Sequence, residues 1–147
     1  MLKVADIGGG PVSTLELSIK CPATLEVHSS DKGGYEGVEH QDMEKLTYED
    51  ESFDIVHCRN ALDHTKDARA AVEEMIRICK PGGIVFIKCW LDQKETGYKH
   101  FWNAKEGGEF ENDNQAFDLK NYGFKIRYVD NGGQRRHNYI EATLEKP

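Results

Sequence analysis

The residues of this chain that are best suited to chemistry are an acid and three glycines after a short apolar run. The segment reads Val4-Ala5-Asp6-Ile7-Gly8-Gly9-Gly10-Pro11. Glycine lets a backbone approach a ligand closely, and N–H groups at the start of a following helix favour anions. A glycine loop after a buried parallel strand is typical of nucleotide sites. Because Val12 and Ser13 follow Pro11, the loop departs from the G-x-G-x-x-G pattern. By itself the loop is therefore only weak evidence for a nucleotide-binding site.

A histidine later in the chain is the best candidate for a catalytic base. His64 qualifies because an unperturbed imidazole titrates near neutral pH, although helix capping or packing would explain the residue equally well. Asn60 and Ala61 precede it and directly follow a strand-like run, at the carboxyl edge where such sheets bind ligands. The acidic segment 39–44 would be split between two strand faces by alternation, so the sequence predicts no metal site.

A mostly parallel sheet would place these residues together. Apolar runs predict core strands over 2–7, 24–27, 52–58 and 84–90, a polar loop over 29–37, and a short edge strand over 38–40. Helices are expected over 13–20 and over 67–79, the second capped by Asp67 and ended by Lys80-Pro81-Gly82-Gly83. A short helix over 117–122 and a hairpin of 124–129 with 139–144 follow. This order predicts an α/β fold with an open, doubly wound, mostly parallel sheet and a C-terminal antiparallel hairpin.

Length and charge narrow the class of protein. The 147 residues suit one domain, 1–147, and the net charge of −7 disfavours nucleic-acid partners and anionic membranes. The basic segment 135–137 is better explained as a solvated hairpin than as an RNA contact. No apolar run reaches the length of a membrane span. Four cysteines without a C-x-x-C pair, and no signal peptide, predict reduced thiols in a cytoplasmic protein.

Four segments together resemble the S-adenosylmethionine-dependent methyltransferases of the Rossmann-like class. They are the glycine loop at 6–10, the acidic loop at 41–46, the strand and turn at 50–64, and the helix end at 74–83. The resemblance covers most of residues 2–90, and its last two segments are the more specific ones. It implies S-adenosylmethionine as cofactor and S-adenosylhomocysteine as product.

The resemblance also implies roles for the residues around the cofactor. The loop of Asp6 and the three glycines would lie under its methionine half, where Asp6 either contacts the ligand or braces the loop. Asp42 would accept from the adenine amino group, and Met43 would offer its backbone N–H and an apolar contact. Family members usually end the second strand with an acid that holds the ribose hydroxyls. Here His28 takes that place, and Asp31 follows three residues later.

The acceptor side falls on a less regular segment. Residues 92–115 are polar, aromatic and glycine-containing, which predicts a lid or a long loop. Trp90, His100, Trp102 and Asn103 could line an acceptor pocket, and Trp102 would fit equally well as core filler. Family members carry N-terminal helices over the cofactor, and this sequence has none before the glycine loop. We therefore expect the lid, a second copy of the chain or a partner subunit to cover the cleft.

The function expected from these observations is methyl transfer to a small-molecule acceptor by in-line displacement. Such a reaction needs donor and acceptor aligned in a dry site, and it needs a base only where the acceptor holds a proton. The alternative is a catalytically degenerate subunit that binds the cofactor or acts as a scaffold. Transfer to protein or RNA is a third option, and the negative charge disfavours RNA.

Overall fold

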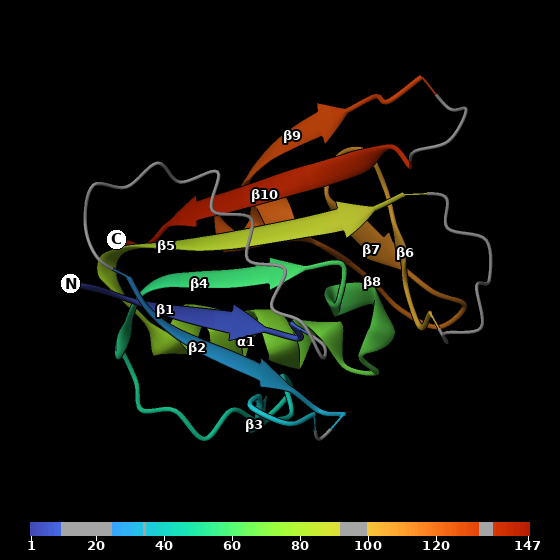
Figure 1. The fold of residues 1–147 in the computed structure, drawn as a ribbon. Helices are drawn as coiled ribbons and strands as arrows, with labels where there is room; N and C mark the ends of the chain where they lie inside the picture. Colours follow the sequence, from blue (N-terminus) through green and yellow to red (C-terminus); the bar gives the residue numbers. More distant parts are fainter. Residues whose placement is uncertain (10–24, 34, 92–99, 133–136) are drawn as a thin grey trace.

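A seven-stranded, mostly parallel sheet forms the centre of the molecule, in the order β3-β2-β1-β4-β5-β10-β9 (Figure 1). The computed structural model describes residues 1–9, 25–33, 35–91, 100–132 and 137–147. The strands are β1 (Leu2–Ile7), β2 (Leu25–Asp31), β3 (Glu39–His40), β4 (Phe53–Arg59), β5 (Cys79–Trp90), β9 (Lys125–Val129) and β10 (Tyr139–Glu145). The first five in this order are parallel neighbours, and β10 runs antiparallel to both β5 and β9. This confirms the predicted α/β class and the terminal hairpin.

Helix α1 (Ala68–Ile78) covers one face of the sheet, behind it in Figure 1. Asp67 caps it as predicted, because its Oδ1 accepts from the Ala70 N–H at 3.0 Å. The buried side chains recur at helical spacing: Ala68, Ala71, Val72, Met75 and Ile78. Burying this stripe against β4 and β5 is what stabilises the helix, since a helix of this length is marginal alone.

The helix passes directly into β5, without the separate stop segment that the sequence predicted. β5 begins at Cys79 and includes the proline and both glycines. A Cβ on Gly83 would lie 2.6 Å from the Asp54 carbonyl oxygen, so only glycine allows this close approach. Lys146 satisfies the helix end, because its Nζ donates to the carbonyl oxygens of Ile76 and Cys79 at 2.9 and 2.8 Å.

Strand β2 is longer than predicted. It continues to Asp31, although its last three residues were expected in a loop. Backbone pairing with β1 carries it, with Asp6 opposite Ser29 and Ile7 opposite Ser30. Ser29 and Asp31 are only partly buried, and the buried Ser30 donates its hydroxyl to the Asp6 carbonyl oxygen at 3.4 Å, so polar side chains are tolerated there.

A second, three-stranded antiparallel sheet lies between residues 103 and 118, where the sequence predicted a lid or a long loop over 92–115. Its strands are β6 (Asn103–Ala104), β7 (Glu109–Glu111) and β8 (Ala116–Asp118), followed by the 3-10 helix η2 (Leu119–Tyr122). Phe110 stacks on Phe117, which meets Trp102 edge to face. This aromatic packing makes the segment part of the core. Residues 92–99 lie outside the described residues, as does the helix predicted over 13–20.

Three of the four cysteines lie in the part of the chain that the structure describes. Cys58, Cys79 and Cys89 are free and buried, and Cys21 lies outside the described residues. None of the helices in the described ranges has the length and apolar character of a membrane span.

Candidate functional site

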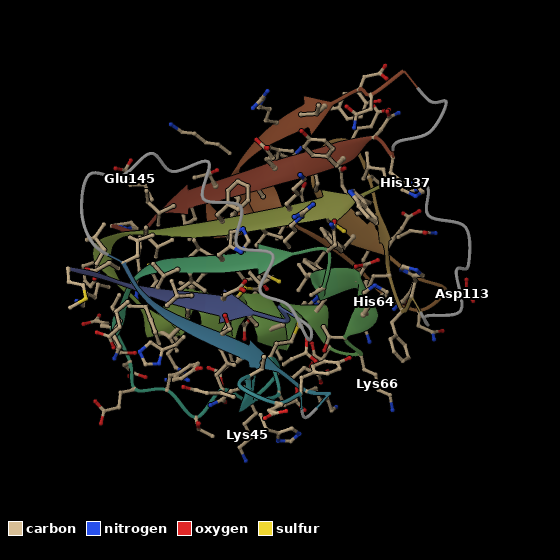
Figure 2. All side chains as sticks on the ribbon, in the orientation of Figure 1. Lys45, His64, Lys66, Asp113, His137 and Glu145 are labelled. Atoms are coloured by element: carbon tan, nitrogen blue, oxygen red, sulfur yellow. The ribbon has the colours of Figure 1, made fainter. Side chains whose placement is uncertain are left out.

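A cavity of about 630 Å³ opens at the end of the sheet toward which β1, β2 and β4 point. Figure 2 places His64 and Lys66 at this end and Glu145 at the opposite end. The wall is built from the carboxyl ends of these strands, the loop after β3 and the turn after β4. Its residues are Ile7, Gly8, Asp31, Lys32, Tyr35, Gln41, Asp42, Met43, Glu44, Asn60, Ala61, His64, Thr65, Lys66 and Phe101.

Gly8 is the closest point of contact between the first loop and the turn after β4. Its φ of +72° is one that L side chains rarely adopt, and a Cβ there would lie 2.6 Å from the Ala61 Cβ. The N–H groups of Gly8 and Gly9 donate to the Ser30 carbonyl oxygen at 2.9 and 3.0 Å. The loop is therefore fastened to β2 and fitted against Ala61. Gly10 lies outside the described residues.

Asp6 lies beneath this loop and is not part of the cavity wall that the structure describes. It is buried, and its Oδ1 is 3.1 Å from His57 Nδ1. A Cβ on Gly9 would come within 2.7 Å of Asp6 Oδ2. Of the two roles left open by the sequence, these contacts support bracing of the loop.

The sequence analysis did not anticipate the pair of Asp6 with His57. His57 also packs, stacking on Phe86 with ring centroids 5.5 Å apart. The parallel register sets Asp6 directly opposite His57 on β4. The signal that could have predicted this pair was an acid and a histidine on two strands expected to be neighbours in the sheet.

The loop after β3 carries Asp42 and Met43, the two residues expected at the adenine, into the wall of the cavity. Asp42 Oδ1 accepts from the Glu44 N–H at 3.0 Å, which sets a tight turn. Its Oδ2 lies 3.3 Å from Lys32 Nζ at the end of β2. An acid and a base thus face each other across two neighbouring loops of the cavity.

Arg77 of α1 holds the next part of this loop. Its guanidinium donates to the carbonyl oxygens of Leu46 and Tyr48 at 3.1 and 2.8 Å, and to Asp50 at 2.8 Å. Its Nε also pairs with Glu74, whose other oxygen accepts from the Leu46 N–H at 3.1 Å. Both α1 side chains thus fix the loop that carries Asp42.

His28 does not lie at the site, which corrects the expectation for the second strand. It sits between Glu26 and Glu39, 2.7 and 3.3 Å from their carboxylates, and the bond to Glu26 is the main cause of its raised pKa. Because β2 continues to Asp31, that acid occupies the strand end and lines the cavity. Asp31 Oδ1 also accepts from the Gly33 N–H at 2.8 Å.

The turn after β4 brings Asn60, Ala61 and His64 to the wall together. Asn60 adopts a left-handed φ of +51°, which asparagine tolerates better than most residues. Its Oδ1 accepts from the Trp90 N–H at 3.2 Å and joins the turn to β5. The 3-10 helix η1 (Leu62–His64) then presents the His64 side chain, of which about 31% is exposed.

Asp63 and His100 lie beside His64, and the sequence analysis did not predict this grouping. Asp63 is buried, and its Oδ2 is 2.6 Å from His100 Nδ1. The rings of His64 and His100 lie 4.2 Å apart between centroids. Adjacent acid and histidine residues after a strand were a visible signal for Asp63, but no local pattern links them to His100.

The four residues predicted for the acceptor side do not line this cavity. Trp102 is core, with its indole N–H donating to the Thr65 and Lys66 carbonyl oxygens at 3.0 and 3.2 Å. Trp90 stacks on His137 at the carboxyl end of β5. His100, Trp102 and Asn103 instead border a smaller hollow of about 210 Å³. Phe101, which was not predicted, lines both spaces.

Comparisons with known proteins agree on one family. A model of the methyltransferase domain matches residues 7–87, more than half of the chain. The uncharacterized methyltransferase YcgJ of Bacillus subtilis is 38% identical over 95 residues, covering 55% of this chain and 38% of that protein. A ubiquinone biosynthesis O-methyltransferase of Thiobacillus denitrificans is 33% identical over 84 residues, covering 53% and 34%. The chain thus spans less than half the length of these two relatives.

Solved structures share the fold. The CurJ carbon methyltransferase superposes with a TM-score of 0.67 at 16% identity, covering 99% of this chain and 49% of that one. A SAM-dependent methyltransferase from Aquifex aeolicus gives a TM-score of 0.59 at 16% identity, covering 97% and 80%. The arrangement of the main sheet therefore recurs in proteins of little sequence similarity.

Proposed function

The chain belongs to the S-adenosylmethionine-dependent methyltransferases of the Rossmann-like class, and we propose that it binds S-adenosylmethionine in the cavity at the ends of β1, β2 and β4. The observation that carries this proposal is the cavity itself. It has the size of a small-ligand site, and it lies at the carboxyl edge of a parallel sheet, where ligands bind in such folds. We further propose that residues 1–147 form one domain, since β10 pairs with β5 across the sheet.

The wall provides separate groups for the parts of the cofactor. Asp31, at the end of β2, is placed to accept from the ribose hydroxyls, which His28 is not. Asp42, on the neighbouring loop, is placed to accept from the adenine amino group, with Met43 giving an apolar surface beside it. Lys32 would orient the Asp42 carboxylate through their 3.3 Å contact. The methionine half would lie over Gly8, toward Asn60 and Ala61.

The reaction proposed is methyl transfer from the sulfonium of the cofactor to a small-molecule acceptor, leaving S-adenosylhomocysteine. The cofactor supplies the electrophile when bound, and the protein aligns the two reactants and excludes water. His64 lines the cavity on the same turn as Asn60 and Ala61, so we assign it as the base for an acceptor that must lose a proton. A small-molecule acceptor accords with the net charge of −7 and with the names of the O-methyltransferase relatives.

Calorimetric titration with S-adenosylhomocysteine tests the cofactor site. We expect one bound ligand per chain, and weaker binding for Asp31→Ala and Asp42→Ala by about tenfold or more, because each variant loses a charge-assisted hydrogen bond. Asp130→Ala is the matched control, since Asp130 is exposed on the terminal hairpin and only accepts from the Gly132 N–H. Folded protein that binds neither S-adenosylmethionine nor its product would refute the proposal.

Transfer of a labelled methyl group tests catalysis separately. Binding of the cofactor without transfer to any small-molecule acceptor, and without slow hydrolysis or self-methylation, would favour the degenerate cofactor-binding subunit. Methylation of an acceptor by the wild type that falls in His64→Ala, with cofactor affinity unchanged, would support the assigned base.

A further inference from the structure

Three metal-ligating side chains converge beside the cavity from two distant parts of the chain. Asp63 and His64 follow β4, whereas His100 precedes β6. Each offers one ligand atom, and these atoms all lie within 4.8 Å of one another. The Phe101 N–H donates to the Asp63 carbonyl oxygen at 2.8 Å, which fixes the two segments against each other. The grouping is therefore held by the backbone as well as by the side chains.

The cluster also holds polar atoms that lack hydrogen bonds. Within the described part of the chain, three buried side-chain nitrogen or oxygen atoms have no hydrogen-bond partner, and two of them are Asp63 Oδ1 and His100 Nε2. A buried polar atom without a partner costs about 1–3 kcal/mol, so such atoms are rare without a ligand or a special role. Two of them in one cluster indicate that the cluster binds a further species.

The charge around Asp63 points to a cation. Its side chain is only about 4% exposed. Its Oδ2 lies 2.6 Å from His100 Nδ1, and its Oδ1 lies 3.9 Å from His64 Nε2. A divalent ion held by both imidazoles would compensate this buried carboxylate.

The donor set indicates the kind of cation. Two imidazoles and one carboxylate suit zinc and its first-row neighbours, whereas magnesium and calcium prefer oxygen alone. In a tetrahedral zinc site the donors stand roughly 3.3 Å apart. The ligand atoms here lie within 4.8 Å of one another, so the most distant pair would need to approach by up to about 1.5 Å. His64 is the member that would move, because its side chain is partly exposed at the cavity wall.

We propose that Asp63, His64 and His100 bind one divalent transition-metal ion of the zinc class at the wall of the cavity. The sequence reading considered only the acidic segment 39–44 and predicted no metal, since nothing local connects His100 with Asp63. Metal binding does not require methyl transfer, but an imidazole nitrogen of His64 that holds a metal cannot take a proton, so in the metal-bound protein His64 would not be the base. A metal held through His64 would face the cavity, where its remaining coordination positions could meet an oxygen or nitrogen of a bound molecule.

Cobalt titration of chelator-treated full chain tests the proposal, with zinc calorimetry alongside. We expect one equivalent of Co²⁺ to bind with visible d–d absorption, and zinc to displace it. His64→Ala and His100→Ala should each weaken binding by about tenfold or more. His40→Ala is the matched control, because His40 is exposed on β3 and lies outside the cluster. Circular dichroism verifies the fold of each variant, and His64→Gln provides a milder change should His64→Ala unfold.

Three results would overturn the site. They are the absence of stoichiometric binding to the folded wild type, equal binding by both cluster variants and the wild type, and a sulfur-to-cobalt charge-transfer band, which would assign the metal to cysteine. Affinity for S-adenosylhomocysteine is measured on the same samples, so a failed metal site and a failed cofactor site give different results.

Discussion

Replacing Gly8 by alanine tests the geometry of the cavity at its narrowest contact. The substitution adds one methyl group at a φ of +72°, and that methyl would lie 2.6 Å from the Ala61 Cβ and 3.3 Å from the Met43 Cε. Non-bonded carbons prefer about 3.5–4.0 Å. Two separate penalties are therefore expected, one from the backbone conformation and one from overpacking.

The two penalties can be measured separately with two further substitutions. A left-handed conformation costs an L-residue about 1–2 kcal/mol, and overpacking of a methyl group costs about 1–3 kcal/mol. Gly8→Ala should thus lower the free energy of unfolding by about 2–5 kcal/mol. Gly37→Ala measures the first penalty alone, because Gly37 has a φ of +74° and a Cβ added there would have no atom within 4 Å.

Ala61→Gly should remove the overpacking, since it deletes the methyl group that Gly8→Ala meets. In urea unfolding, the double variant should recover about 1–3 kcal/mol relative to the sum of the single effects. Calorimetry with S-adenosylhomocysteine should show the same rescue, because the displaced loop lines the proposed site. A Gly8→Ala that costs no more than Gly37→Ala, or a double variant whose effects are additive, would refute this account of the loop.

Three further predictions concern the site and its supports. Asp42→Ala should remove discrimination for the adenine amino group, so that the variant and the wild type bind an analogue without this group equally well; a variant that still strongly prefers adenine would contradict the assignment. Arg77→Ala should lower the free energy of unfolding by about 2–4 kcal/mol, because it removes the donor to the Leu46 and Tyr48 carbonyl oxygens and to two carboxylates. The control Arg127→Ala, at an exposed position, should lower the free energy of unfolding by at most about 1 kcal/mol. Equal losses in the two variants would refute the bracing role of Arg77. Burial raises the pKa of the Cys58 thiol to about 12, so the folded protein should protect it from alkylation at pH 9. Since the unfolded thiol loses its proton first, stability should fall as the pH rises from 9 toward 12, and a flat profile in which Cys58→Ala behaves like the wild type would count against this shift.

The sequence predicted best those elements whose buried positions carry apolar side chains in a regular pattern. The run over β5 is apolar because it lies inside the sheet, and the stripe on α1 repeats at helical spacing because one face is packed. The end of β2 carried no such signal. Its final residues are polar, and the backbone pairing with β1 that extends the strand leaves no mark on side-chain type.

The cavity wall was predictable where it follows strand ends and unpredictable where it depends on packing between distant segments. Gly8, Asn60 and Ala61 come directly after strands, so their placement required only a parallel sheet. Trp102 could serve either a pocket or the core, and its hydrogen bonds to Thr65 and Lys66 across the fold decide for the core. These contacts join residues far apart in the sequence, so no local sequence pattern could have predicted the position of Trp102.

The order of strands bears on how quickly the molecule forms and how long it lasts. Asp6 of β1 meets His57 of β4 across 51 positions, so the centre of the sheet requires long-range pairing, a feature of chains that fold in milliseconds to seconds. The cavity wall exists only after β1, β2 and β4 have paired. A molecule bound there stabilises the finished sheet and leaves the barrier to its assembly unchanged. Occupancy of the cavity would therefore lengthen the lifetime of the folded chain without hastening its formation.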